Sequence, residues 1–353
     1  MEKINKTDVK ALSAKDVNSD SLGDFYNKAY PKRANYTEDM WKWIYRSYLC
    51  NNEIPHVLVY KDQVIAHAGT IPVNVTFDDK KLTFSWFTDF KVLPEFQGQG
   101  LGPILSKERM KDSEIHVGLT NTPNSLKALL KLGWKESTDT YFHRNFIKPF
   151  SHPRFARKMP LVLQIVLNFL SNPFLYFIYK KHFKKSSESD ISKLDENSLK
   201  RFYDLYLQAE MKKKSKNMVL PIRDEDFLTW RIKNSPNREK YYIYSVENFS
   251  AILLLNNNHG EYIDILWVSD NTQFLQIRNM ISTLFFWGRN KGDSYIRFYT
   301  TNKELSYYLK KHTKSVVTNP TFSFFSENKS LLNKLENAKW DVELIDNDFE
   351  KFI

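Results

Sequence analysis

Cysteine is almost absent from this chain. Cys50 is the only one among 353 residues, so no disulfide can form within the chain. Such cysteine usage fits a reducing compartment, and we therefore expect a cytoplasmic protein. Cys50 lies in a polar stretch without a nearby histidine, which argues against a nucleophilic role. The first twenty residues lack an apolar block, so the sequence does not predict a signal peptide.

Most of the chain also lacks a strong excess of one charge. The net charge is +11, but residues 1–150 carry 21 basic and 18 acidic side chains, and residues 191–353 carry 24 and 21. Residues 151–190 carry 7 basic and 2 acidic side chains. This distribution argues against a nucleic-acid partner, because a binding footprint would need a broad basic surface. It favours one local anionic partner or a membrane face near the middle of the chain.

Glycine is scarce, yet three of the ten glycines stand close together. Gly98, Gly100 and Gly102 follow a predicted strand over 82–92, and Pro103 suits the first turn of the helix that comes next. Glycines at this spacing allow a sharp turn and a close approach of a ligand to the main chain. The backbone N–H groups of such a turn, at the positive end of a helix, form a site for a pyrophosphate.

Other interpretations of the glycines are weaker. A glycine-rich hairpin turn remains an alternative. No Gly-Lys-Ser/Thr follows, which excludes a Walker phosphate loop. The Gly-x-Gly-x-Gly spacing, with no acidic residue at the end of a second strand, fits a dinucleotide-binding fingerprint poorly.

Two ordered motifs resemble those of the GCN5-related N-acetyltransferases. Gln97-Gly98-Gln99-Gly100-Leu101-Gly102 is similar to the family signature Gln/Arg-x-x-Gly-x-Gly/Ala, and the residues from Asn124 to Gly133-Trp134 are similar to its second motif. The match covers residues 24–144. The resemblance implies that acetyl-CoA is the acyl donor and that no metal is needed. It implies cofactor-binding roles for Val92, Leu93, Gln97, Gly98, Gln99, Gly100, Leu101, Gly102, Pro103 and Asn124.

The chemistry requires an amine without its proton, and therefore a group that accepts that proton. Asp89, on the strand before the glycines, is the first candidate base, and His67 is the second. Trp86 beside Asp89 could raise the pKa of that carboxyl by desolvation. Many family members carry a tyrosine as general acid where this chain has Leu129, so we expect Tyr141 to take that role, unless coenzyme A leaves as the thiolate. The backbone N–H of Leu93 is the expected donor to the oxyanion.

The middle of the chain changes in composition. Two apolar runs, 161–170 and 174–179, are separated by Ser171-Asn172-Pro173 and flanked by basic residues. Gln164, Asn168 and Ser171 would form one narrow polar stripe on a helix. The interruption argues against a membrane span. A buried linker helix is one interpretation, and an interfacial helix that brings residues 158–185 to a membrane with anionic lipid is the other.

The second half echoes the first in its order of elements. We predict a cofactor-binding domain over 1–148, a linker over 149–190 and a degenerate second copy of the fold over 191–353, with a plain α+β substrate domain as the alternative. Asp264 would correspond to Asp89. The expected acceptor site includes Trp43, Trp86, Trp230 and Arg231, in a groove between the halves that His259 and Trp267 would also line.

Together these features predict an α/β (α+β) protein in which mixed sheets are flanked by helices and the acetyltransferase-like fold occurs twice. The expected activity is transfer of an acetyl or short acyl group to a primary amine of a small molecule. A loose resemblance to bacterial enzymes of surface-polysaccharide assembly suggests an amino sugar as the acceptor. Two alternatives remain: an aminoacyl-tRNA-dependent peptidyltransferase of the cell-wall-bridge type, and a non-catalytic protein that binds acyl-CoA.

Overall fold

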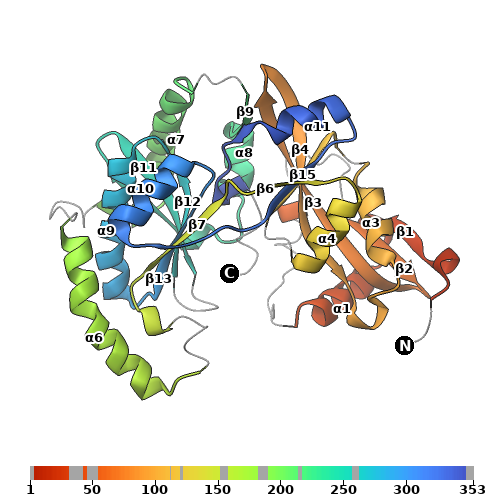
Figure 1. Ribbon diagram of the computed structural model, residues 1–353, viewed down its shortest axis with the longest axis horizontal. Coiled ribbons are helices and arrows are strands. Elements are labelled where there is room, and N and C mark those ends of the chain that lie inside the picture. Colours follow the sequence, from red (N-terminus) through yellow and green to blue (C-terminus); the bar gives the residue numbers. More distant parts are fainter. Residues whose placement is uncertain are drawn as a thin grey trace.

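The computed structural model describes residues 4–31, 43–45, 55–111, 113–119, 122–151, 158–181, 190–213, 217–256 and 262–346. Two mixed sheets lie side by side, each flanked by helices (Figure 1). The predicted α/β class with two similar units is confirmed, because both sheets share one strand order, as described below.

The first sheet contains the residues around the glycine loop. Its main path runs in the order β1 (Lys10–Ser13), β2 (His56–Tyr60), β3 (Gln63–Phe77), β4 (Lys80–Val92), β5 (Ile115–Leu119), β15 (Phe322–Phe325) and β6 (Lys135–Ser137). Two short strands extend it, because β9 (Met218–Pro221) pairs with β3 and β16 (Lys339–Trp340) pairs with β9. Only β4 and β5 are parallel along the main path, and the other neighbours are antiparallel.

The second sheet repeats this pattern. Its order is β8 (Ile191–Lys193), β10 (Tyr241–Val246), β11 (Phe249–Asn256), β12 (Tyr262–Val268), β13 (Tyr295–Thr300), β7 (Tyr141–Phe146) and β14 (Val316–Thr318). Again one pair, β12 with β13, is parallel and the others are antiparallel. The second half of the chain is therefore built on the same plan as the first.

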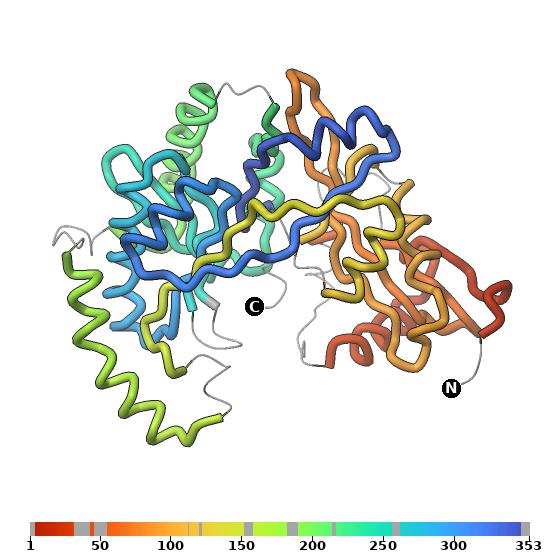
Figure 2. Tube along the Cα trace, in the orientation of Figure 1, coloured from red at the N-terminus to blue at the C-terminus, as the bar shows by residue number. Residues whose placement is uncertain are grey.

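The two halves exchange one strand. β7 follows β6 in the chain but lies between β13 and β14 of the second sheet, whereas β15 lies between β5 and β6 of the first. Figure 2 shows the two segments passing each other between the sheets, one yellow and one blue. Each sheet thus contains a strand from the other half. The division of the chain near residues 148 and 190 stays a prediction.

Nine α-helices are described, and several begin at side chains that accept a hydrogen bond from the first turn. They are α1 (Ser19–Ala29), α3 (Leu101–Arg109), α4 (Pro123–Lys131), α6 (Leu161–Lys180), α7 (Glu196–Glu210), α8 (Glu225–Leu228), α9 (Phe274–Lys291), α10 (Lys303–Thr313) and α11 (Lys329–Glu336). Asn18, Thr122, Asp195, Asn302 and Asn328 are such N-caps. α3 differs, because the left-handed Gly100 precedes it and no side chain caps it.

The central strand of each sheet carries a bulge. In β4 the residues Asp89 and Phe90 stand opposite the single residue Ala68, because His67 pairs with Lys91 and Gly69 pairs with Thr88. In β12 the extra residue is Leu266. The predicted equivalence of Asp264 with Asp89 is therefore wrong. Asp264 lies two positions before its bulge and forms an ion pair with Arg297 of β13, which uses its carboxylate.

α6 differs from one of the two sequence interpretations. The helix continues through Pro173 without a break. Tyr179 is its one side chain that is fully buried, and none of its most apolar 18-residue window is buried in the structure. A buried linker helix is thus contradicted. By length and composition alone, α6 is long and apolar enough to cross a membrane.

Candidate functional site

The glycine loop lies at the surface and opens toward solvent. Gly98 and Gly100 are exposed and have φ values of +76° and +77°, a backbone region that side chains strain. A Cβ built on Gly98 would meet no atom within 4 Å, so open space lies above it. The first N–H groups of α3 have no partner inside the helix. Leu101 and Leu105 are buried and anchor this end of α3 on the sheet.

The N-terminal segment lies against this loop. The Ile4 backbone N–H donates to the Gln99 side-chain oxygen over 2.8 Å. Lys6 is exposed, and its Nζ would lie only 2.8 Å from a Cβ built on Gly100. An ammonium group therefore stands beside the backbone amides of the loop. Gln97 is used locally, since its amide donates to the Val92 carbonyl over 2.8 Å. The arrangement suits an anion with more than one negative charge.

Asp89 lies in the bulge of β4 and is half-buried. Asp89 has a φ of +46°, a left-handed conformation that aspartate tolerates better than most residues. The Tyr45 hydroxyl lies 2.5 Å from the Asp89 Oδ2 atom and 3.0 Å from the Thr88 hydroxyl. Gly69 makes room for the Tyr45 ring, because a Cβ there would lie 2.3 Å from that ring. The Tyr45 hydroxyl thus helps to orient the carboxylate.

His67 is completely buried beneath this carboxylate. Its Nδ1 lies 3.1 Å from the Asp89 carbonyl oxygen, and its Nε2 lies 2.8 Å from the Tyr26 hydroxyl. A carbonyl can only accept, so Nδ1 carries the proton and Nε2 accepts from Tyr26. With both ring nitrogens engaged, His67 holds the bulge in place. This geometry favours Asp89 over His67 as the base, although both roles stay predictions.

Two of the predicted catalytic contacts are not formed. The Leu93 backbone N–H donates to the Ile65 carbonyl over 2.9 Å, so it is used within the sheet and is not available to an oxyanion. Tyr141 lies on β7, which the exchange carries into the second sheet opposite Thr300. Its hydroxyl donates to Asp139 over 3.2 Å. Burial, with Asp139, raises the pKa of Tyr141, which makes it a poorer acid. The sequence did not predict that β7 leaves the first sheet.

The aromatic residues expected to line an acceptor groove are buried in the structure. Trp86, Trp43 and Trp230 are 1%, 7% and 5% exposed. The two indoles of Trp43 and Trp230 donate to each other's backbone carbonyls, over 2.6 and 2.7 Å. Arg231 is 1% exposed and donates to the Ile345 carbonyl over 2.8 Å. Burial therefore disagrees with the prediction that these four residues contact a substrate in an open groove.

Other predicted residues are placed as follows. Asn124 is exposed near the start of α4, and Pro103 is exposed in the first turn of α3. Gly102 is half-buried, and a Cβ built on it would lie 3.5 Å from the Phe90 ring. Trp267 is fully buried against Phe202 and Tyr206. Cys50 and His259 lie outside the described residues. No group of three or more His, Cys, Asp or Glu side chains that could hold a metal occurs in the described parts of the chain.

The described pairing of β4 with β5 ends before the site. Its parallel pairing with β5 covers Phe84 to Phe87, which stand opposite Ile115 to Gly118. β4 itself continues to Val92, and across the described ranges no residue of β5 pairs with this last part. The backbone of β4 leads from Asp89 to the glycine loop, so an extended ligand held at the loop would run along this strand.

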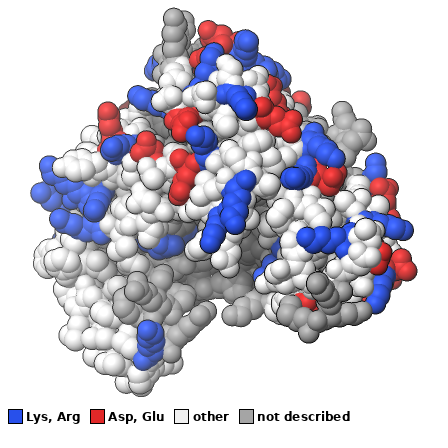
Figure 3. Space-filling view, turned by 45° about the vertical axis from the view of Figure 1, so that its right-hand side comes forward, with Lys and Arg blue, Asp and Glu red and all other residues white. Residues whose placement is uncertain are grey.

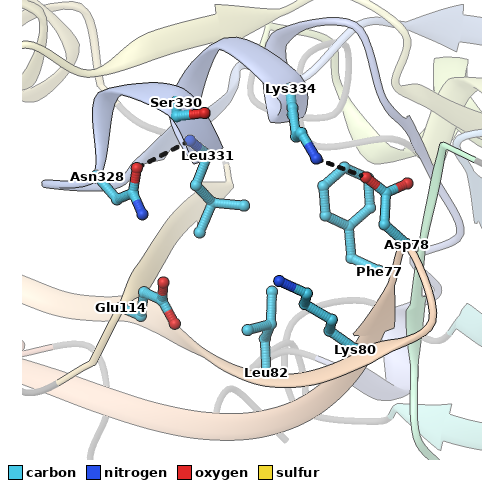
Figure 4. Close-up of a pocket in the computed structure, with 9 residues that line it drawn as sticks. All are labelled: Phe77, Asp78, Lys80, Leu82, Glu114, Asn328, Ser330, Leu331 and Lys334. Atoms are coloured by element: carbon cyan, nitrogen blue, oxygen red, sulfur yellow. Dashed lines mark hydrogen bonds and ion pairs between the residues drawn. The ribbon is translucent and has the colours of Figure 1, made fainter.

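A small pocket lies at the opposite end of β4. It has a volume of about 190 Å³ and lies between the turn that joins β3 to β4 and the helix α11 (Figure 4). Lys334 reaches across it to Asp78 over 3.1 Å, while Asn328 caps α11 through the Leu331 N–H (Figure 4). The pocket is a junction between the two halves and shares no residue with the glycine loop or Asp89.

Sequence reasoning missed three residues of the site. Tyr45 and Tyr26 belong to an aromatic-rich segment that predicts core packing as readily as polar contacts. Lys6 lies in a polar segment more than ninety residues before the loop, and no local pattern links the two. The spacing of aromatic residues gives no information on which hydroxyls meet a carboxylate.

Comparisons with known proteins identify the fold. No protein-family model and no curated protein matches the chain. A structure of N-myristoyltransferase from Saccharomyces cerevisiae with bound myristoyl-CoA and inhibitors is 12% identical, with a TM-score of 0.61, over 92% of this chain and 81% of that one. A GCN5-related N-acetyltransferase from Kribbella flavida is 11% identical, with a TM-score of 0.55, over 90% of this chain and 72% of that one.

A third similar structure is a probable N-acyltransferase from Enterococcus faecalis V583. It is 12% identical, with a TM-score of 0.53, over 90% of this chain and 71% of that one. At such identities the likeness describes the fold and not the activity. It covers nearly the whole chain, in agreement with the repeated strand order of the two sheets. The chain thus has a fold similar to those of N-myristoyltransferase and a GCN5-related N-acetyltransferase, and its two sheets share one strand order.

Proposed function

We propose that this protein is an acyl-CoA-dependent N-acyltransferase. The observation that carries the proposal is the open glycine loop at the start of α3, with the left-handed Gly98 and Gly100 and the Lys6 ammonium beside it. Backbone amides at a helix start, together with one cation, bind a diphosphate without base-specific contacts. Coenzyme A carries such a diphosphate, and its pantetheine arm would run from the glycine loop along β4 toward Asp89.

The position of the thioester at the end of the pantetheine arm indicates which residues would take part in the reaction. The arm would bring the thioester to the bulge of β4, where Asp89 faces Tyr45. The amine nitrogen attacks the thioester carbonyl carbon, the new C–N bond forms and the C–S bond breaks. Asp89 takes the proton that the amine loses, and coenzyme A leaves as the thiolate and is protonated from solvent. The protein contributes mainly by holding amine and thioester in attack geometry.

The proposal also specifies the acyl group and the acceptor. We put acetyl first because the two sequence motifs resemble those of N-acetyltransferases. A small primary amine is the acceptor, with an amino sugar as the first candidate. The structural neighbour described with bound myristoyl-CoA makes a long acyl chain the alternative to test beside acetyl.

Thermal unfolding tests the cofactor half of the proposal. Acetyl-CoA at about a hundred times its Kd should stabilise the wild type by about 2.7 kcal/mol. Gly98→Ala fills the open space of the loop, and should remove most of this stabilisation. Gly292→Ala is the matched control, because Gly292 also has a positive φ, of +94°, but ends α9 in the second half. Equal stabilisation of both variants by acetyl-CoA would contradict the proposal.

Thiol release tests the catalytic half. Acetyl-CoA and myristoyl-CoA are each incubated with glucosamine, a polyamine, an amino acid and a peptide, and free thiol is measured with the acylated amine. We expect one thiol for each amide formed, with acetyl-CoA and glucosamine as the best pair. Stabilisation by acyl-CoA without thiol release for any amine would instead indicate a non-catalytic acyl-CoA-binding protein.

A further inference from the structure

A continuous row of large apolar side chains is exposed along the whole length of α6. The most exposed, at 60–74%, are Leu161, Val162, Ile165, Phe169, Leu170, Phe174 and Phe177. By the 100° step of an α-helix they spread over an arc of about 220° around the helix axis, so the row covers more than half of the helix surface. A soluble surface rarely shows an apolar patch larger than a few hundred Å². The row therefore needs a partner that covers it.

Two sets of contacts fix α6 to the protein. Asn168 donates to the Ser151 hydroxyl over 2.9 Å and accepts from the Phe150 backbone N–H over 2.9 Å. Near the other end, the Tyr179 ring stacks on Phe285 of α9 at 4.2 Å, and its hydroxyl donates to the Thr313 carbonyl. Asn168 of the polar stripe predicted from the sequence thus faces the protein. The side chains of the apolar row lie on the parts of the α6 surface that these contacts leave exposed.

Charge is distributed in a way that matches a lipid surface. No charged residue occurs between Lys158 and Lys180, while Lys158, Lys180 and Lys181 flank the row and are exposed. Lys180 lies on the same side of the helix as the row, by the 100° step of an α-helix. Figure 3 shows the lowest part of the molecule, where α6 lies in Figure 1, as mostly uncharged surface.

We propose that α6 docks the protein on a membrane that contains anionic lipid. The helix lies in the plane of the interface, with Phe169, Phe174 and Phe177 among the acyl chains and Lys158, Lys180 and Lys181 at the headgroups. This inference uses no residue of the glycine loop or of the Asp89 site, so it stands apart from the proposed acyltransferase activity.

The contacts of α6 favour docking over crossing. The helix would be about 30 Å long, which matches a bilayer core. However, a crossing helix would have to leave Ser151 and Phe285, because both contacts hold it along the side of the protein. A second copy of this chain is the other possible cover. The basic residues at both ends argue against it, because a symmetric pair of such helices would bring like charges together.

Vesicle sedimentation of the full chain tests the proposal. Phosphatidylcholine vesicles are compared with vesicles in which about a third of the lipid is phosphatidylglycerol. We expect the wild type to sediment with the anionic vesicles, less in high salt, and at least tenfold less with the neutral ones. An alkaline carbonate wash should release it, as for a peripheral protein. Retention after the wash would overturn the in-plane position.

A pair of variants separates docking from a general effect. Phe169→Gln with Phe177→Gln removes two exposed rings and should lower binding to anionic vesicles at least tenfold. Leu207→Gln with Met211→Gln is the control, since Leu207 is exposed on α7 and Met211 is exposed directly after it, and Figure 1 places α7 at the far end of the second unit. The control should bind as the wild type does. All variants should keep the wild-type melting temperature, because the changed side chains are exposed.

Three outcomes would overturn the proposal. One is a wild type that sediments with neither kind of vesicle. Another is equal binding of the α6 variant and the α7 control. The third is a wild-type dimer in solution that the α6 variant converts to a monomer, because a second copy would then cover the apolar row.

Discussion

Trp43 and Trp230 donate their indole N–H groups to each other's backbone carbonyls, over 2.6 and 2.7 Å. The sequences 40–45 and 227–232 are similar, and Trp43 corresponds to Trp230 in them. The centroids of their two rings lie 6.4 Å apart. The pair is therefore a nearly symmetric bond between the halves, and Tyr45, two residues further on, holds the Asp89 carboxylate. The short segment from Trp43 to Tyr45 therefore both joins the halves and contacts the proposed base, Asp89.

Replacing either indole should weaken the whole protein. Trp43→Phe or Trp230→Phe leaves a buried carbonyl without its donor, so we expect the free energy of unfolding to fall by about 1–3 kcal/mol each beyond the loss of ring area. Chemical denaturation measures it. Trp134→Phe is the control, because Trp134 is 2% exposed and its indole N–H has no hydrogen-bond partner among the described residues. A control as damaging as the two variants would mean that ring size alone matters.

Asp89→Asn should lower turnover without loss of cofactor binding. Asparagine keeps the hydrogen bond to Tyr45 and tolerates the positive φ, but it does not take a proton at neutral pH. Loss of a general base reduces kcat by about 10²–10⁴-fold. Thiol release gives the rate, and stabilisation by acetyl-CoA reports binding. Wild-type turnover in Asp89→Asn would show that another group accepts the proton.

Lys6 should contribute to coenzyme A affinity by its charge. Lys6→Gln removes the ammonium beside Gly100, and we expect the Kd for coenzyme A to rise severalfold, with a weaker dependence on salt. Calorimetric titration at two salt concentrations measures both. Lys10→Gln is the matched control, because Lys10 is exposed on the neighbouring strand β1. If both variants raise the Kd equally, only the general charge of the segment is involved.

Stability should fall as the pH rises toward 8. Glu343 is buried and accepts from the Val268 N–H over 2.9 Å, and burial raises the pKa of its carboxyl to about 8. Arg223, at 3.8 Å, only partly offsets this burial. Since the folded state holds this proton more tightly than the unfolded state, the stability that this group contributes is fully present below the ordinary pKa of 4.5 and is lost up to about pH 8.

Chemical denaturation across this pH range measures whether the free energy of unfolding falls as the pH rises. Each unit of pH inside the window costs at most about 1.4 kcal/mol for one group. Glu343→Gln removes the titrating carboxyl and should flatten the dependence, whereas Glu247→Gln, at an exposed position, should leave it as in the wild type. A slope that is unchanged in Glu343→Gln would exclude this carboxyl as its source.

Local patterns predicted much of this fold. Glycine spacing located the loop between β4 and α3, and the order of elements predicted the second copy. The exchange of β7 and β15 could not be predicted in this way. It depends on pairing between residues far apart in the chain, such as Phe322 with Leu119, and the residues of either strand would suit both sheets.

The site was predicted unevenly for a similar reason. Gly98 and Gly100 have positive φ values, which follow from a local property of glycine. The roles expected for Trp230 and Arg231 depended on which surfaces stay open, and the contact between the halves buries both. Lys6 reaches the loop only through the folded N-terminal segment. Hydrogen bonds between distant side chains, such as Tyr45 with Asp89, leave no periodic trace in the sequence.

A crystal structure of the protein with coenzyme A tests the central claim most directly. The account predicts the diphosphate within hydrogen-bonding distance of the backbone N–H groups between Gly98 and Gly102, with the Lys6 ammonium beside it and the thiol end near Asp89. Coenzyme A bound elsewhere, or a loop that stays empty at saturating coenzyme A, would contradict it.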